Sequence, residues 1–249
     1  MQKLIVAAVW LALWWLLSTL IDLKSMLLPD FTSVVSALGS ILSSPPFYSH
    51  LGQTLMRLLP GLFASILAGI PIGLLLAQYS GPRTFFEPFL TLIRGIPVAS
   101  LFPVAILLFG IGDGARSALT IYVAFPILVT STLAGAMERP ENRIRRDYLR
   151  IHKDRLRWFD MPLCLLWDAM PSIIGGVRVA IGLALVVIIV SEMFFVGGSG
   201  IGWYTWDQYQ AFNFPNMYAA ILVIGSISLA IDSALNMAIR VLGMNGYEN

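Results

Sequence analysis

The chain has 249 residues, of which 57% are hydrophobic and only 12% are charged, and its formal net charge is +2. Charged residues make up about 25% of an ordinary soluble domain, so this composition excludes one and predicts a polytopic membrane protein. The single cysteine, Cys164, excludes a disulfide within the chain, and the two histidines, His50 and His152, are too far apart for a local zinc motif.

Six apolar segments are long enough to cross a bilayer, which takes about 20 residues of helix. They cover residues 4–21, 55–78, 88–110, 116–136, 173–195 and 217–242. The first has a short positive flank and no A-x-A cleavage site after it, so we interpret it as an uncleaved, peripheral helix rather than a signal peptide. We therefore predict an all-α integral membrane protein: a single transmembrane domain over residues 1–249, with its core spans within 55–242.

Local signals shape the segments around the second and third spans. Asp30 can cap a short amphipathic helix, whose predicted apolar face consists of Val34, Val35, Leu38, Ile41 and Leu42. Gly69 and Gly73 have the small-xxx-small spacing that lets two helices approach closely. A hydrophilic turn is expected at 79–83 and a tight turn at 109–114. Pro97 and Pro103 should bend or break the third span, as is common near a pathway.

The most polar segment, residues 137–172, separates the fourth and fifth spans. It contains eight of the sixteen Lys and Arg residues and six carboxylates, so it cannot lie in hydrocarbon. Ile144, Tyr148 and Ile151 fall at i, i+4 and i+7, which predicts a helix with one apolar stripe. Two interpretations remain open: a docking surface for a soluble partner, or a basic loop lying against anionic lipid.

The basic residues also predict the orientation of the chain. With 137–172 in the cytoplasm, six spans place both termini there as well. Cytoplasmic segments then hold that cluster together with Lys3, Arg83, Arg94 and Arg240. The outward connections keep only Lys24, Arg57 and Arg116.

Ionisable residues within spans usually face an interior or a pathway. Glu192, near the outer end of the fifth span, could serve a gate, a structural hydrogen bond or substrate contact, or simply lie at the interface. Arg94 could line the inward mouth and favour an anion, or extend to lipid phosphate. Arg178 is most simply an anchor or a loop clamp, and Asp232 should pair within the bundle.

Residues 196–214 form a glycine- and aromatic-rich connection between the last two spans. Two interpretations of its aromatic cluster are open. It fits an aromatic belt at the membrane interface, or a contact with an external binding protein. The residues are Trp203, Tyr204, Trp206 and Tyr209.

Several short patterns occur in the order in which one transporter family has them. They are 50–57 (HLGQTLMR, similar to H-xxx-SL-x-R), 69–73 (GIPIG), Arg94-xx-Pro97-xxxxx-Pro103, 109–112 (FGIG), 170–183 (similar to LP-xIL-x-GLRIALGL) and 191–193 (SEM, similar to AEM). Over about residues 50–240 the chain thus resembles the inner-membrane permease of binding-protein-dependent ABC importers, in the nitrate, bicarbonate, taurine and alkanesulfonate branch. The resemblance implies a type I (MetI-like) permease fold.

The cytoplasmic signature departs from the family pattern, EAA-xxx-G followed by LP-xxLP. Counting back from Pro171 places Tyr148, Leu149 and Arg150 on EAA and Asp154 on the glycine. A slip of one residue places Asp147 on the glutamate and Lys153 on the glycine instead. Either alignment replaces small residues by large or charged ones, which puts the docking geometry in doubt. The chain could be the divergent half of a heterodimer, or its ATPase could have co-adapted.

The resemblance also implies partners and site residues. A second permease copy or a paralogue, two ATPase subunits, an extracytoplasmic solute-binding protein and membrane lipid are expected, in a bacterial inner membrane; nucleic acid is not. No G-xxxx-GK-[ST] loop occurs, so this chain is not expected to be an enzyme or to hold a cofactor, and ATP and magnesium belong to the ATPase. Candidate docking residues are Asp147, Tyr148, Leu149, Arg150, Ile151, Asp154, Leu156, Trp158 and Phe159. Candidate pathway or gate residues are Arg94, Pro97, Pro103, Arg178 and Glu192.

Two other functions are weighed against ATP-driven import of a small hydrophilic solute, with the family branch favouring a small anion. A secondary transporter driven by an ion gradient would favour paired intramembrane carboxylates, and only Glu192 and Asp232 lie deep in spans. A membrane enzyme would need a catalytic cluster, and neither HExxH nor GxSxG occurs.

Overall fold

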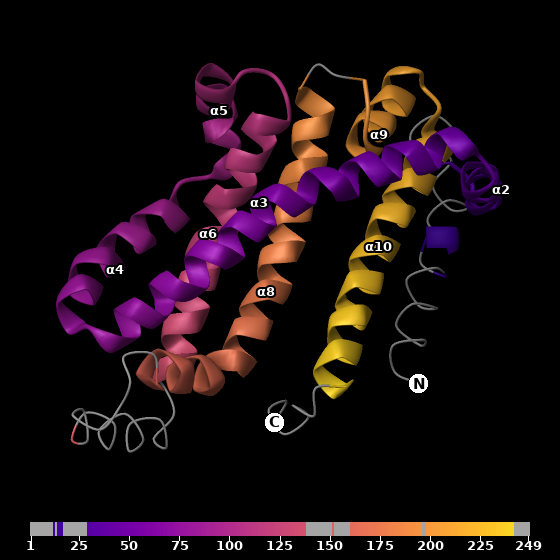
Figure 1. Cartoon of the computed structure of the whole chain (residues 1–249). Helices are drawn as coiled ribbons and strands as arrows, with labels where there is room; N and C mark the ends of the chain where they lie inside the picture. Colours follow the sequence, from indigo (N-terminus) through magenta and orange to yellow (C-terminus); the bar gives the residue numbers. More distant parts are fainter. Residues whose placement is uncertain are drawn as a thin grey trace. The chain divides into compact units, whose positions relative to one another are not determined.

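The computed structural model of the chain describes residues 12, 14–16, 29–137, 151, 160–195 and 198–241. Its elements are α2 (Phe31–Leu42), α3 (Pro45–Gln78), α4 (Ser80–Gly95), the 3₁₀ turn η1 (Val98–Leu101), α5 (Phe102–Phe109), α6 (Asp113–Met137), α8 (Asp160–Phe194), α9 (Ile201–Gln210) and α10 (Phe214–Val241) (Figure 1). Four of them, α3, α6, α8 and α10, are long and apolar enough to cross a membrane, and α4 with η1–α5 forms a fifth, bent pair. The predicted all-α membrane fold is confirmed.

The chain divides into two compact units. The first unit comprises Met1–Leu55 and Ile189–Leu229, and the second comprises Met56–Ile188 and Ala230–Asn249. The single permease domain expected over 1–249 stays a prediction. Most of the predicted first span, 4–21, lies outside the described residues, but residues 12 and 14–16 are helical. The ring of Trp14 lies 5.7 Å from that of Tyr218 within the first unit.

Helix α2 anchors the core of the first unit. Asp30 occupies the N-cap position as predicted, but its side chain makes no cap hydrogen bond. The buried face of α2 is narrower than predicted, because Val35 and Leu42 are exposed. The buried cluster of this unit consists of Val34, Ala37, Ile41, Phe47, Ala219 and Val223. The members from α2 follow the i, i+3, i+7 spacing of one helical face.

Helices α3 and α6 pack closely and in parallel in the second unit. A Cβ added to Gly61, Gly69 or Gly73 of α3 would lie within 3 Å of the Cβ of Thr120, Leu128 or Thr132 of α6, respectively. Each of these pairs differs by 59 positions, so one register holds along the whole interface. The predicted close approach at Gly69 and Gly73 is confirmed, and Gly61 extends it by two turns.

Helix α8 runs antiparallel to α6 and begins well inside the segment expected to be a polar loop. Gly135 lies against Ser172, and Gly176 lies against Ser131. Residues 160–172 of the predicted polar segment are the first turns of α8, and the bounds of that segment as a cytoplasmic loop stay a prediction. Figure 1 shows these turns at a steep angle to the rest of α8, which contains Pro171.

The first turns of α8 are stabilised as helix because their apolar face packs in a buried cluster. The buried cluster they enter combines the end of α3, α4, the end of α6 and the start of α8. Its members are Leu76, Ala77, Leu90, Val129, Leu133, Ala136, Leu165, Ala169 and Ile173. Residues 138–150 and 152–159 of the predicted loop lie outside the described residues.

Three further helical segments lie where the sequence analysis placed no helix. α3 begins at Pro45, ten residues before the predicted span, and α4 begins at Ser80 within the predicted hydrophilic turn. Proline in the first turn of a helix loses no hydrogen bond and favours the helical φ. The prolines in the first turns of α3 and α4 are therefore compatible with helix starts. The connection 196–214 contains a helix, α9.

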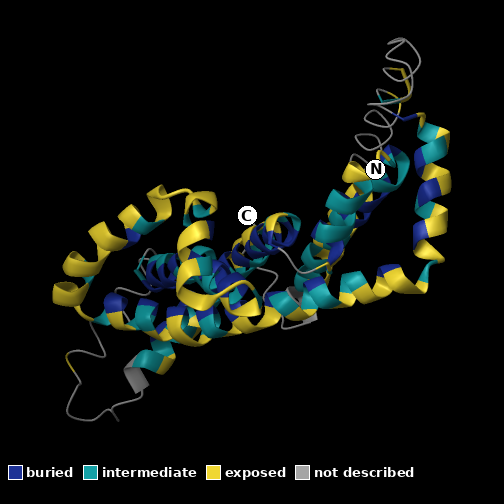
Figure 2. Cartoon of the chain, turned by 90° about the horizontal axis from the view of Figure 1, so that it is seen from above, coloured by how far each residue is buried: buried dark blue, intermediate teal, exposed yellow. Residues whose placement is uncertain are grey.

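The predicted third span, 88–110, is not one helix. α4 and the η1–α5 segment meet at an angle of 89° across Ile96 and Pro97. Both residues have extended backbone angles, and Pro97 has no N–H group with which to continue α4. Exposed residues dominate along α4, where Leu90 is the only buried residue (Figure 2). The predicted tight turn after Phe109 is present, with Gly110 at φ 75°.

Candidate functional site

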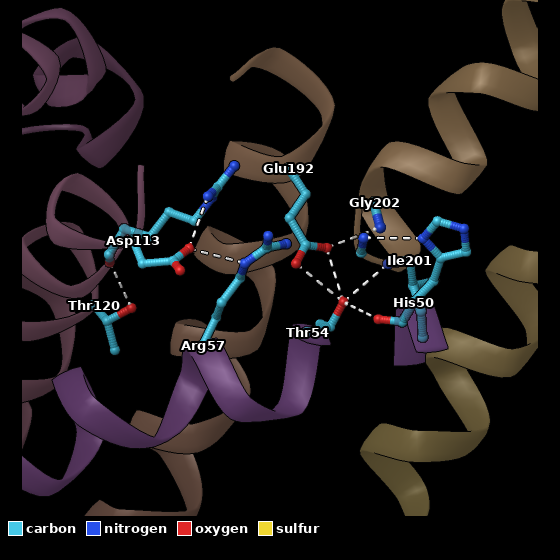
Figure 3. A network of polar contacts seen from close by, with 10 residues as sticks. His50, Thr54, Arg57, Asp113, Thr120, Glu192, Ile201 and Gly202 are labelled. Carbon is cyan, nitrogen blue, oxygen red and sulfur yellow. Dashed lines mark hydrogen bonds and ion pairs between the residues drawn. The ribbon is translucent and has the colours of Figure 1, made fainter. Parts of the chain in front are cut away.

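In the first unit, the carboxylate of Glu192 near the end of α8 is fully buried. The Thr54 hydroxyl of α3 lies 3.1 and 2.9 Å from its two oxygens, and the N–H of Gly202 donates to Oε2 at 3.0 Å (Figure 3). The N–H of Ile201 donates to the Thr54 oxygen at 2.9 Å. The first N–H groups of α9 have no partner within the helix, and they donate to Thr54 and Glu192 instead. Negative charge is favourable at that end of a helix dipole.

Two glycines let α9 approach Glu192 this closely. A Cβ at Gly200 would lie 2.1–2.3 Å from the Glu192 carboxylate, and Gly200 has φ +103°. A Cβ at Gly202 would lie 2.1 Å from the carbonyl oxygen of Ile189. Neither position tolerates a side chain, so glycine at 200 and 202 lets α9 begin beside the buried carboxylate. The predicted residue Glu192 is thus placed in a structural network, while its role as a gate stays a prediction.

His50 and α9 form the other side of this network. The N–H of Gly200 donates to Nδ1 of His50 at 3.2 Å, so in this arrangement Nδ1 is the acceptor. The imidazole stacks on Trp203 with ring centroids 5.3 Å apart. Tyr204 packs edge-on against Phe47 at 5.4 Å. Burial, and secondarily the charge of Asp207, raises the pKa of the Tyr204 phenol.

The aromatic residues of α9 thus contribute to the packing of the first unit. Trp206 lies 5.7 Å from Phe194 of α8 and 5.2 Å from Tyr209. Tyr209 itself is half exposed. An aromatic belt and a contact with a binding protein both stay predictions for this cluster.

In the second unit, three of the predicted pathway residues lie in α4, in α5 or at the break between α4 and η1–α5. Arg94, Pro97 and Pro103 are all exposed. The Tyr122 hydroxyl of α6 donates to the Ile93 carbonyl at 2.5 Å and lies 3.3 Å from that of Ile96. It therefore occupies carbonyl groups that lose their helical partners where α4 ends.

Arg178, another predicted pathway residue, forms an ion pair within the second unit. Its Nε lies 3.0 Å from Oδ1 of Asp232 on α10, and its Nη2 donates to Asn236 Oδ1. The Asn236 side chain in turn donates to Asp232 at 3.3 Å. Asp232 thus pairs within the bundle as expected, and Arg178 is the partner. The pathway role of Arg178 stays a prediction.

A second charged cluster of the second unit was not among the candidates. Oδ1 of Asp113, the first residue of α6, lies 2.9 Å from Arg57 Nε and 2.9 Å from Arg116 Nη1 (Figure 3). Arg57 and Thr54 both belong to the motif at 50–57, which pointed to them without indicating a role. Asp113 directly follows the FGIG turn, so the two motifs meet here.

The predicted docking residues cannot be placed, except for one. Ile151 is described and exposed. The other eight lie outside the described residues: Asp147, Tyr148, Leu149, Arg150, Asp154, Leu156, Trp158 and Phe159. Their role in docking stays a prediction.

No protein-family model matches the chain. It is 27% identical to the taurine transport system permease protein TauC of Escherichia coli, over 94% of this chain and 86% of that one. It is 27% identical to the nitrate import permease protein NrtB of Synechocystis, over 72% and 64% of the two chains. It is 29% identical to the bicarbonate transport system permease protein CmpB of Synechococcus elongatus, over 72% and 63%. With its long apolar helices, the chain is thus a multi-pass membrane protein homologous to ABC transport permeases, as its motifs predicted.

Proposed function

We propose that the chain is the transmembrane subunit of an ATP-driven importer and forms the pathway for a small hydrophilic solute, preferably a small anion. The observation that carries this proposal is the similarity to the taurine permease over 94% of the chain. The solutes named for these relatives, taurine, nitrate and bicarbonate, are all small and carry a negatively charged, oxygen-bearing group. This common feature supports a small anion as the solute. We place the protein in a bacterial cytoplasmic membrane with both termini in the cytoplasm.

The broken span supports a position of Arg94, Pro97 and Pro103 on that pathway. Non-helical backbone at membrane depth is tolerated only where it is buried in protein or lines water, because lipid offers no hydrogen-bond partners. Residues 95–97 are exposed on this chain. We infer that in the assembled transporter they face the aqueous pathway, with Arg94 beside it.

The energy for transport comes from separate ATPase subunits in this proposal. They hold ATP and magnesium, and they dock on the cytoplasmic loop through the candidate residues 147–159. A second permease chain completes the pathway, and a solute-binding protein delivers the solute from outside. ATP-driven closure of the ATPase pair shifts the permease between inward- and outward-facing states.

The test is a pull-down of the tagged chain from gently solubilised membranes, followed by mass spectrometry. Wild type is compared with Tyr148→Ala/Leu149→Ala and with a matched variant of the same loop, Arg143→Ala/Arg145→Ala. We expect an ATPase to co-purify with wild type and the arginine variant and to be lost from the Tyr148/Leu149 variant. A chain that always purifies alone, with uptake that follows an ion gradient, would replace this proposal by secondary transport.

A further inference from the structure

Arg178 and Asp232 lie well inside two helices that are long and apolar enough to cross a membrane. Arg178 precedes the end of α8 at Phe194 by 16 residues, and Asp232 follows the start of α10 at Phe214 by 18 residues. At the rise of an α-helix these separations are about 24 and 27 Å, so the two charges lie at similar depths. Both depths are within the hydrocarbon of a bilayer, which is about 30 Å thick.

A polar cluster of three side chains holds the guanidinium group of Arg178. Its Nε lies 3.0 Å from Oδ1 of Asp232, and its Nη2 donates to Oδ1 of Asn236. Asn236 in turn donates to Oδ2 of Asp232 at 3.3 Å. The side chains of Arg178 and Asp232 are nevertheless 35% and 45% exposed. The two charges are therefore paired, and a substantial part of each lies on the surface of this chain.

Two glycines flank Arg178 on the same face of α8. Gly175 is three positions before Arg178 and Gly182 is four positions after it, which is the spacing of one helical face. A Cβ added to either glycine would meet no atom within 4 Å. At the neighbouring Gly176, in contrast, a Cβ would lie 2.5 Å from that of Ser131 on α6. Within the described part of the chain, Gly175 and Gly182 thus leave open space beside Arg178 instead of admitting another helix.

This face of α8 has three candidate surroundings in a membrane: lipid, a second permease chain and water. Lipid is disfavoured, because charged side chains within spans are costly there and usually face a bundle interior or a water-filled cavity. A second chain packed directly on the cluster would have to desolvate both charges, which is expensive even for a pair. Water keeps the exposed parts of Arg178 and Asp232 hydrated, and the glycines leave room for it.

We propose that Arg178, Gly175 and Gly182 line the aqueous pathway of the transporter. Asp232 and Asn236 are positioning residues, which hold the Arg178 guanidinium group at the wall of that pathway. The inference rests on the proposed function, in which a second permease chain completes the pathway. A wall of that pathway is exposed on the single chain, as this cluster is.

The first test measures the access of water to two neighbouring positions of α8. Gly182→Cys and Leu183→Cys are made in a Cys164→Ser chain, which lacks the only native thiol. Leu183 is 46% exposed on this chain, so its own fold does not protect that position. Membrane vesicles are treated with charged methanethiosulfonate reagents. We expect Gly182→Cys to react faster by roughly a factor of ten or more, because a thiol forms its reactive thiolate only in a polar environment.

The second test asks whether the charges of the cluster face the same water. A sulfonate-bearing and an ammonium-bearing reagent are compared on Gly182→Cys, and the ratio of their rates cancels changes in the reactivity of the thiol itself. Side chains four positions apart on a helix are about 5–6 Å apart, where a unit charge in water changes each rate roughly threefold. Arg178→Gln should therefore lower the ratio of the sulfonate rate to the ammonium rate by up to roughly tenfold. Asp232→Asn should raise that ratio.

Two controls complete the design. Arg178→Lys keeps the charge and should leave the ratio near its starting value, which separates loss of charge from misfolding of Arg178→Gln. Arg83→Gln removes an arginine that pairs with Glu87 on α4 and should leave the ratio unchanged.

Three results would overturn the inference. One is an equal rate at Gly182→Cys and Leu183→Cys, and another is a ratio that Arg178→Gln does not change. The third is a Gly182→Cys thiol that neither reagent reaches and that forms a disulfide with a second copy on oxidation, because a second chain then covers the glycines.

Failure of the inference and failure of the proposed function give different results. The thiol reactions report on water beside α8, whereas co-purification of an ATPase tests the importer. An ATPase partner together with an unreactive Gly182→Cys thiol refutes the placement of Arg178 alone. Water access with the expected change in the ratio, in a chain that binds no ATPase, refutes the importer and leaves Arg178 on an aqueous pathway.

Discussion

Glu192 and Asp113 are both carboxylates beside the N-terminus of a helix, but they differ in how far they are buried. Glu192, near the end of α8, faces the first N–H groups of α9, is fully buried and accepts from a hydroxyl and a backbone N–H. Asp113 begins α6, is largely exposed and is held by two arginines. The first arrangement completes the hydrogen bonds of the fold. The second leaves the Asp113 carboxylate within reach of solvent.

This difference predicts how each carboxylate responds to perturbation. The contacts of a buried carboxylate depend on local geometry and are screened little by salt. An exposed carboxylate held by charges depends on ionic strength and tolerates local change. The three predictions below test this contrast, from the largest expected effect to the smallest.

The Glu192 network should be broken most severely by a side chain at Gly202. The Cβ of Gly202→Ala would lie 2.1 Å from the Ile189 carbonyl oxygen, which is backbone and cannot move aside. We expect a loss of roughly 3 kcal/mol in the free energy of unfolding, the upper range for overpacking. Chemical denaturation in detergent would measure it.

Gly52→Ala is the matched control for that substitution. Gly52 also lies in the first unit, and an added Cβ there meets no atom within 4 Å. Its free energy of unfolding should be unchanged or higher by up to about 1 kcal/mol, because alanine favours a helix more than glycine does. Equal losses at Gly52 and Gly202 would contradict the close contact of α9 with α8.

Loss of the Thr54 hydroxyl should have an intermediate effect. Thr54→Val preserves the shape of the side chain but leaves the Ile201 N–H and the Glu192 carboxylate without this partner. A buried group deprived of its partner costs about 1–3 kcal/mol. Thr54→Ser, which keeps the hydroxyl, should retain most of the stability. If the serine and valine variants unfold alike, the hydroxyl is not what holds α9.

The smallest effect should come from Asp113→Asn, and it should depend on salt. Exposed ion pairs contribute up to about 1 kcal/mol at low ionic strength. We expect the stability difference between Asp113→Asn and wild type to shrink between 0.05 and 1 M sodium gluconate, because the Debye length falls from roughly 14 Å to 3 Å. The effect of Thr54→Val should stay constant over the same range. A salt-independent effect at Asp113 would remove the contrast between the two carboxylates.

The sequence predicted the spans well because lipid imposes a length and an apolar composition that can be counted. Five of the six predicted spans fall on described helices, including the bent pair. The prolines were harder to interpret. Pro45 starts α3, whereas Pro97 separates α4 from η1. Only the surrounding fold decides whether a proline lies at a first turn or in an interior.

The site was predicted in part, for a similar reason. A structural hydrogen bond was one of the roles left open for Glu192, and the structure gives it Thr54 and Gly202 as partners. Their identity depends on how α9 folds back, which no local pattern contains. Arg57 and Arg116 were assigned to outward connections as separate charges. Their proximity follows from the register between two helices, and that register became visible only when the glycine contacts were known.

The shared core at the end of α3 has a mechanical consequence for the segment between α6 and α8. Ala136, just before that segment, and Leu165, just after it, belong to one buried cluster with Leu76 and Leu90. The residues that flank the segment on both sides are therefore packed in the same core. A displacement of Ala136 or of Leu165 would therefore disturb the packing of four helices rather than of one.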